Sequence, residues 1–235
     1  MVGLQSKSIH QLIQGALSMK FASVLLLLAV FSVNAQDTQE SQSAFTSGLH
    51  YTELSPAYET GNDEQVVVYE FFGYMCPHCA NFQTYMKPWH DKLPENVTLV
   101  RVPVVFQPGW DVYAKAYYTA ESMGILEQTH QAMFDALHKE RKRFSTLEQV
   151  ADWYAENFNV DKEAFLSTAK SFMIDSKVRQ STNMFQRMQV TSTPTLVING
   201  KYKPNVKALG SYNALFELAT FLADKEVAEL SLNTQ

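Results

Sequence analysis

Apolar residues form short continuous runs near the two ends of the chain, and between these runs they recur at helical spacing. The run at 66–72, broken only by Glu70, predicts a buried strand. A second run at 97–106 predicts another strand, in which Pro103 favours an edge or a bulge. Residues 195–202 predict a strand entering a hairpin turn at Asn199-Gly200, and residues 50–54 predict a short edge strand.

Helical spacing occurs in three segments. Apolar residues from Phe82 to Leu93 fall on one helical face directly after the first long strand, and Pro88 predicts a kink near Lys87. Residues 111–188 have a helical pattern throughout, with a capping box predicted at 145–148 and a cap at Asp161. A last amphipathic helix is predicted at 211–230. The methionine and aromatic stripes are typical of a helical core.

The predicted order is strand, helix, strand, a block of helices, a strand hairpin and a helix. Such an order is typical of an α/β layer fold. The helical block covers roughly 75 residues, which is too long for a connecting loop, so we expect an inserted subdomain. A chain of 235 residues fits one domain with such an insertion.

The first residues predict a secretory signal peptide. Lys20 precedes an apolar run at 21–33, and the small-residue ending at Ala35 suits cleavage there, so residues 1–35 are expected to be removed. Met19 is an alternative start. A membrane anchor is the other interpretation, but the run is short for a span. Residues 36–48 are polar and aperiodic, and they predict a flexible mature N-terminus.

The charge changes the picture little. The net charge is −5, and removal of 1–35 takes away Lys7 and Lys20 but no acidic residue, which leaves −7. No broad basic surface for nucleic acid is therefore expected.

Cys76 and Cys79 are the only two cysteines of the sequence, and they lie where the strand at 66–72 gives way to a helix. Secretion would place them in an oxidising compartment. A disulfide that closes so short a loop removes little chain entropy, so its structural value is small. A close pair at a strand-to-helix turn therefore indicates redox chemistry. The alternative is half a zinc site, but zinc needs four ligands and no second cysteine pair is present.

The residues around this pair resemble a known family. Phe71-Phe72-Gly73-Tyr74-Met75-Cys76-Pro77-His78-Cys79 resembles the active site of the DsbA-type thiol:disulfide oxidases of the periplasm, which belong to the thioredoxin superfamily. The segment 190–202, with Thr193-Pro194, resembles their cis-proline loop and the following hairpin. The resemblance covers roughly 49–228. It implies a thioredoxin fold interrupted by a helical-domain insertion at about 110–188.

The family implies an activity, a location and partners. Such an enzyme oxidises paired cysteines in secreted or periplasmic proteins, and a quinone-linked membrane partner of the DsbB type re-oxidises it. The resemblance also implies a strongly lowered cysteine pKa and an oxidising disulfide, which are inherited from the family. No metal and no cofactor besides the Cys76–Cys79 disulfide are expected, and nothing demands more than a monomer.

Each site residue has an expected role. Cys76 is the expected nucleophile, because unpaired N–H groups at a helix start favour an anion, while Cys79 lies one turn on and faces inward. Pro77 and His78 between them are expected to tune the thiolate. By resemblance, the Thr193-Pro194 bond is cis, faces the cysteines and exposes backbone to an extended substrate peptide.

Glu70 interrupts an apolar strand, and spacing within the family favours a buried acid near Cys79 that transfers protons. Arg101 lies where relatives place a basic partner of that acid. Gln83 takes a position that is Glu in some relatives, which predicts a reduced charge network. An apolar groove beside the cysteines, or simply core packing, is expected of four further residues: Tyr74, Met75, Phe106 and Trp110.

Two other functions compete with the oxidase. Thr193 is common in isomerase and reductase branches, so an isomerase or reductase with the same site is the closest alternative. A non-catalytic peptide- or metal-binding protein that keeps the fold is the other. Isomerase and reductase relatives usually carry an extra dimerisation domain, for which the segment before the first strand leaves little room.

Overall fold

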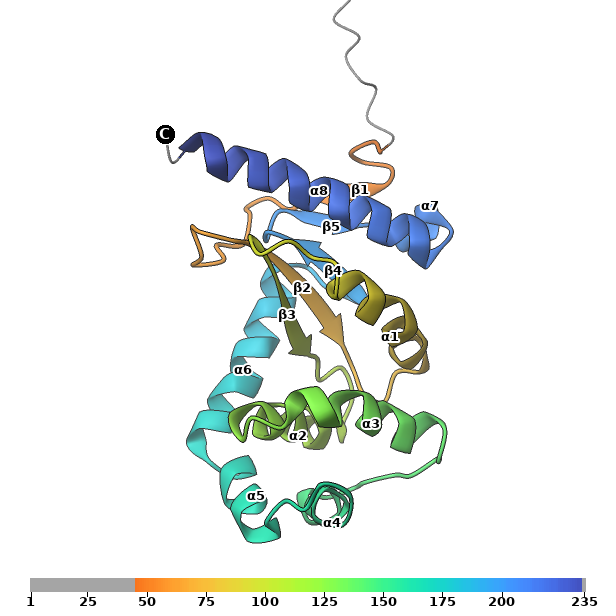
Figure 1. Cartoon of the computed structure of the whole chain (residues 1–235), viewed down its shortest axis with the longest axis vertical. Coiled ribbons are helices and arrows are strands. Elements are labelled where there is room, and N and C mark those ends of the chain that lie inside the picture. The colour runs from red at the N-terminus through yellow and green to blue at the C-terminus, as the bar shows by residue number, and fades with distance from the viewer. Residues whose placement is uncertain (1–44, 234–235) are drawn as a thin grey trace, which may run out of the picture. The chain divides into compact units, whose positions relative to one another are not determined.

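The computed structural model describes residues 45–233, which build a five-stranded mixed sheet with helices around it (Figure 1). The strand order is β1-β5-β4-β2-β3. Strands β2 and β3 are parallel, whereas β2–β4, β4–β5 and β1–β5 are antiparallel. The strands are β1 (Tyr51–Glu53), β2 (Val66–Phe72), β3 (Val97–Pro103), β4 (Thr195–Ile198) and β5 (Tyr202–Pro204).

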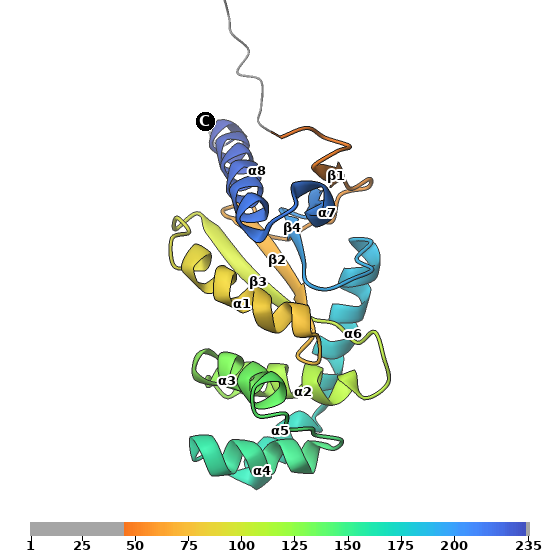
Figure 2. The same cartoon turned by 90° about the vertical axis from the view of Figure 1, so that its right-hand side faces the viewer.

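The helices cover both faces of the sheet and its lower end. Helices α1 and α8 pack on one face and α6 on the other, while α2 to α5 lie beyond the carboxyl end of β2 (Figures 1 and 2). The helices are α1 (Pro77–His90), α2 (Trp110–Ser122), α3 (Leu126–His138), α4 (Leu147–Phe158), α5 (Lys162–Ala169), α6 (Phe172–Arg187), α7 (Val206–Leu209) and α8 (Tyr212–Asn233).

Strand β2 is buried along its whole length because both faces of the sheet are covered. Val66 and Val68 pack with Phe82 of α1 and with α8, whereas Val67 and Tyr69 face α6. This two-sided burial explains why the strand reads as a continuous apolar run. At its end, the chain turns directly into the segment that carries the cysteines.

Helices α2 to α6 occupy the interval between β3 and β4, where the sequence predicts a helical insertion. The predicted cap at Asp161 is confirmed, because its side chain accepts a hydrogen bond from the Ala164 N–H. The capping box of α4 is shifted by one residue. Thr146 is its N-cap, and the reciprocal bond comes from Gln149, whose Oε1 accepts from the Ser145 N–H at 2.7 Å.

Several predicted boundaries change. The strand at 97–106 ends at Pro103, which cannot donate to a ladder, although the Val104 N–H still reaches the Phe72 carbonyl at 2.8 Å. Helix α1 continues through Pro88 and ends at His90. The predicted hairpin is confirmed, since Asn199 and Gly200 both have positive φ, as a type I′ turn requires.

The predicted signal peptide at 1–35 lies outside the described residues, as does most of the segment 36–48. The last four residues of that segment, 45–48, are described and make contacts with the rest of the fold. The ring of Phe45 lies 5.7 Å from that of Phe221 on α8, and Ser47 bridges to Tyr51. None of the helices between residues 45 and 233 is long and apolar enough to cross a membrane.

Candidate active site

Cys76 is the N-cap of helix α1, and Gly73–Met75 connects it to the end of β2. The Cys76 N–H donates to the Gly73 carbonyl at 3.0 Å, which closes a turn. Pro77 follows in the first helical turn, where a missing N–H costs no hydrogen bond. Both cysteines are unbridged, so the geometry is that of the dithiol form.

The Cys76 thiolate is stabilised by donors from two parts of the chain, the start of α1 and the loop before β4. The strongest is a hydrogen bond from Cys79, followed by one from the Thr193 side chain and by the backbone N–H groups of Cys79 and His78. These bonds outweigh the cost of burial and lower the pKa of Cys76 to about 5. One contact acts in the opposite sense, because the thiol form donates to the Thr193 carbonyl at 3.5 Å. Together, the donors favour an anion on Cys76.

Cys79 has the opposite character. Its side chain is fully buried, and burial raises its pKa well above the usual value, as does its hydrogen bond to Cys76. The two sulfurs, three residues apart, therefore differ strongly in acidity. One is prepared to leave or attack as an anion, and the other is held as a thiol.

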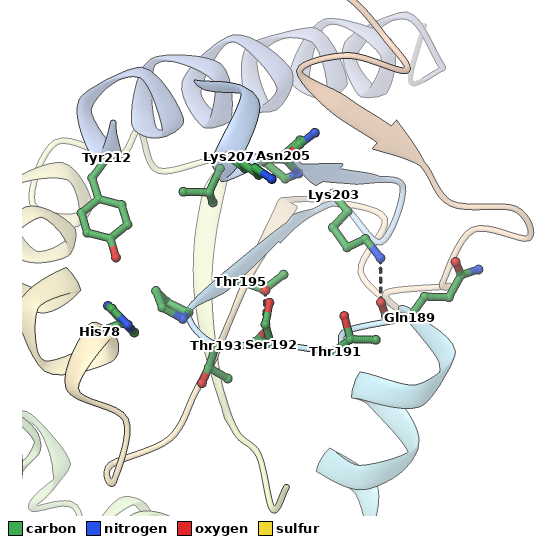
Figure 3. A pocket seen from close by; sticks show the side chains of 13 residues that line it. His78, Gln189, Thr191, Ser192, Thr193, Thr195, Lys203, Asn205, Lys207 and Tyr212 are labelled. Atoms are coloured by element: carbon green, nitrogen blue, oxygen red, sulfur yellow. Dashed lines mark hydrogen bonds between the residues drawn. The ribbon is translucent and has the colours of Figure 1, made fainter. Parts of the chain in front are cut away.

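The loop before β4 faces the cysteines. The Thr193–Pro194 bond is cis, and the Thr193 side chain contributes to the pKa of both sulfurs. His78 lines the same pocket as this loop, and its ring lies on the side of Tyr212 (Figure 3), while the groups that stabilise the Cys76 thiolate include only the backbone of His78. His78 thus contributes to the thiolate through its backbone N–H, while its side chain faces the pocket.

The pocket beside the loop has a volume of about 470 Å³. Basic and hydroxyl side chains border it, and no acidic residue does. Lys203 donates to the Gln189 carbonyl at 2.6 Å, and neither Lys203 nor Lys207 has an acidic partner among the ion pairs of the described residues (Figure 3). The sequence did not reveal this wall, because Lys203, Asn205, Lys207 and Tyr212 follow the hairpin without any motif of their own.

Glu70 lies in the middle of β2 with no exposed surface. Its carboxylate accepts from Gln83 Nε2 at 2.6 Å, and Arg101 Nε lies 3.3 Å away across the β2–β3 register. Burial raises the pKa of Glu70, while Arg101 and Gln83 pull it downward. Cys79 is not among the groups that shift the pKa of Glu70. The two residues are connected through helix α1, because Gln83, which bonds to Glu70, lies one turn after Cys79 in that helix.

The residues expected to form an apolar groove are distributed differently. Tyr74 is buried in the core of the insertion, and Trp110 packs over Gly73. Phe106 contacts the rings of Trp110, in a tilted arrangement, and Phe185, edge to face, with ring centroids 6.3 Å and 5.2 Å away. Met75 is partly buried against the same core. Core packing, the alternative for these residues, therefore describes Tyr74 and Trp110 better.

The described residues contain no group of three or more His, Cys, Asp or Glu side chains that could hold a metal ion.

A C-x-x-C turn at the start of a helix, facing a cis-proline loop on a mixed sheet, defines a thioredoxin-fold protein that exchanges thiols and disulfides. Residues 60–214 match the family model described as thioredoxin.

Curated relatives give the narrower family. The chain is 37% identical over 206 residues to "Thiol:disulfide interchange protein DsbA" of Pseudomonas aeruginosa, a match that covers 88% of this chain and 95% of the relative. It is 33% identical to the protein of that name from Pseudomonas syringae pv. tomato, covering 88% and 94%. The crystal structure of Pseudomonas aeruginosa DsbA superposes with a TM-score of 0.75 at 39% identity, covering 80% of this chain and 97% of that one.

The chain belongs to the DsbA family of thiol:disulfide oxidoreductases. The fold predicted from the sequence, a thioredoxin fold with a helical insertion, is confirmed.

Proposed function

We propose that this chain donates its Cys76–Cys79 disulfide to cysteine pairs of secreted proteins in the periplasm. The observation that carries the proposal is the difference in acidity between the two sulfurs, with the pKa of Cys76 lowered to about 5 and that of Cys79 raised. A stable thiolate favours the reduced protein, so the disulfide is readily given away. The same argument disfavours a reductase, which requires a stable disulfide form.

The reaction proceeds in two exchanges. A client thiolate attacks Sγ of Cys76, the Cys76–Cys79 bond breaks, and Cys79 departs with the electron pair and takes up a proton. The client's second thiolate then attacks the client sulfur of the mixed disulfide and releases Cys76 as a thiolate. The client loses two electrons and the protein gains them. The low pKa of Cys76 makes it a good leaving group in the second exchange.

Glu70 is the proposed proton donor and acceptor for Cys79. Burial raises its pKa, so it holds a proton more readily than an exposed carboxyl. Its direct partners are Gln83 and Arg101, so a proton must reach Cys79 through an intervening group such as a water molecule. In a Glu70→Gln variant, the titration of Cys79 should change; an unchanged titration would remove Glu70 from the mechanism.

Thr193 and Pro194 form the proposed docking wall for the client. The loop lines the pocket (Figure 3), and its Thr193 carbonyl lies 3.5 Å from Cys76 Sγ, so the backbone of an extended peptide could pair with the loop next to the reactive sulfur. After each turnover, a membrane quinone oxidoreductase of the DsbB type would restore the disulfide. The predicted signal peptide and the periplasmic setting of the family support this location.

A redox titration tests the proposal. The purified protein is equilibrated with graded ratios of reduced and oxidised glutathione while the thiolate absorbance in the ultraviolet is followed. We expect a thiolate that forms near pH 5 and a disulfide that is reduced by mild reductant. A Cys76 pKa near its usual value together with a strongly reducing potential would contradict the oxidase.

Trapping of clients tests the order of the exchanges. A Cys79→Ser variant cannot release a bound client by internal attack, so mixed disulfides at Cys76 should accumulate. The matched control is Cys76→Ser, which retains the buried sulfur and should trap few clients because Cys79 is fully buried. Equal trapping by both variants would show that the assignment of Cys76 as the attacking sulfur is wrong.

A further inference from the structure

Gly73–Met75 determines where Cys76 lies, and it belongs to neither a strand nor a helix. Helices of the insertion hold it. A Cβ on Gly73 would lie 2.3 Å from the Trp110 ring at the start of α2. The Tyr74 ring is buried, with its centroid 4.9 Å from that of Phe134 on α3. The backbone just before the reactive cysteine is thus enclosed by α2 and α3.

Two histidines of α3 are hydrogen-bonded to Tyr74 in this segment, one to its main chain and one to its side chain. The Tyr74 carbonyl lies 2.7 Å from His138 Nε2, and the Tyr74 hydroxyl lies 2.8 Å from His130 Nδ1. A carbonyl can only accept, so His138 carries its proton on Nε2. Main chain and side chain of Tyr74 are therefore both tied to the insertion.

The protonation state of His130 favours a hydrogen bond to Tyr74 that persists across the ordinary pH range. The ring is 6% exposed, and burial followed by the charge of Arg101 holds its pKa well below the usual range, so it is neutral. Tyr74 likewise keeps its proton, because burial raises its pKa. A neutral, buried pair of this kind is not weakened by pH or salt in the ordinary working range.

The position of Cys76 depends on these ties through the turn that follows Tyr74. The Cys76 N–H is bonded to the Gly73 carbonyl, so a rotation of the Tyr74–Met75 peptide would displace the sulfur. Its stabilising donors, from Cys79, His78 and Thr193, act only at hydrogen-bond distance. We propose that His138 and the Tyr74–His130 pair are positioning residues through which the helical insertion holds Cys76 in its reactive geometry.

The proposal rests on the assignment of Cys76 as the attacking sulfur, and it is tested by a property of the free protein. In Tyr74→Phe, which removes only the hydroxyl, and in His138→Ala, the thiol–thiolate equilibrium of Cys76 should shift toward the thiol by about threefold to tenfold. The glutathione equilibrium should move in the same sense, toward the disulfide. His138→Gln, whose amide N–H can donate to the same carbonyl, should restore most of the loss.

Tyr113→Phe is the matched control. Tyr113 is a buried tyrosine of the insertion whose hydroxyl donates to the Phe144 carbonyl at 3.0 Å, outside the site. This variant should lose stability without any change in the Cys76 titration. If Tyr74→Phe and His138→Ala also lose only stability, the two histidines are structural and the proposal is wrong. A normal Cys76 pKa in the unmodified protein would instead overturn the proposed function, so the two failures are distinguishable.

Discussion

The sheet and the helical insertion have cores of different chemistry. The core between the sheet and helices α1 and α8 combines aliphatic side chains such as Val66 and Val68 with the stacked rings of Phe82 and Phe216. The insertion packs tyrosines, histidine and tryptophan, and its rings form two clusters, one that includes Phe72, Tyr74 and Phe134 and one that includes Tyr154 and Phe165. Hydroxyl and imidazole groups need partners when buried, and the insertion supplies them within its own core in the Tyr74–His130 and Tyr118–Ser181 pairs.

The redox site lies where these two cores meet. The sheet side supplies the cis-proline loop and the buried Glu70, and the insertion supplies the contacts that hold Tyr74 and Gly73. Cys76 and Cys79 both belong to the aromatic core. Under the proposed roles, the sheet side faces the client, whereas the insertion holds the backbone just before Cys76. Four measurements can break or sharpen this division.

The largest effect is expected where the insertion touches the site backbone. In Gly73→Ala, the added Cβ meets the Trp110 ring at 2.3 Å, so the segment or the ring must move. We expect a loss of about 3 kcal/mol in the free energy of unfolding, the upper part of the usual range for overpacking. Urea unfolding of the oxidised protein measures it. The cost should shrink in a Trp110→Leu background, and an equal cost in both backgrounds would contradict the contact.

The second effect separates the redox states. Because the pKa of Cys76 is about 5 when folded and near 8.5–9 when unfolded, the reduced protein gains stability as pH rises above 5 and loses it as pH falls through 5. The gain relative to the oxidised protein should be roughly 2 kcal/mol at pH 7, allowing for partial solvent screening. Urea unfolding of both forms from pH 4.5 to 8.5 measures it. Parallel profiles would show that the thiolate is not stabilised.

The third effect belongs to the sheet side. The pKa of Glu70 is raised by burial, so its contribution to stability decreases as pH rises from about 4.5 through the folded pKa. Glu70→Gln removes this titration and should flatten the pH profile of the oxidised protein. Chemical unfolding between pH 4 and 8 gives the slope, with Glu127→Gln on the exposed end of the network as control. A steeper dependence of stability on pH in Glu70→Gln would show that the pKa of Glu70 is lowered in the folded protein and not raised.

The smallest effect concerns the client pocket. Lys203 and Lys207 border it without an acidic neighbour in its lining, so a client with Glu beside its cysteine should be oxidised faster than one with Gln. We expect a ratio of about threefold at low salt, falling in Lys203→Gln/Lys207→Gln. Stopped-flow oxidation of the paired peptides gives the ratio, and Lys170→Gln on the insertion is the matched control. A ratio independent of salt and of both lysines would exclude a charge effect.

Local patterns predicted the parts of the molecule that obey a single period or a single motif. Strand β2, the hairpin at Asn199-Gly200 and the cap at Asp161 are set by neighbouring residues, so their positions follow from the sequence. The C-x-x-C turn belongs to this group, since the placement of Cys76 at a helix start follows from the run of residues around it.

Contacts between distant segments could not be predicted in the same way. Nothing near His138 or His130 in the sequence points to Tyr74, more than fifty residues earlier, because the bonds join α3 to the end of β2. The wall of Lys203 and Lys207 depends on how the chain after the hairpin folds back toward His78. The one-residue shift of the α4 cap shows that the exact start of a helix is also hard to predict from the sequence. Glu148 and Gln149 both fit a capping box, so the pattern alone does not select one of them.

The packing of Trp110 on Gly73 has a consequence for protein engineering. Joining β3 directly to β4 would retain the strands, α1 and the cis-proline loop, which together hold both cysteines and the loop that faces them. Such a shortened chain would leave Phe72 and Tyr74 bare at the end of β2 and would remove α6 from one face of the sheet. The helical insertion is therefore required for the geometry of the active site. An active site transferred from this protein to another scaffold should include helices α2 and α3.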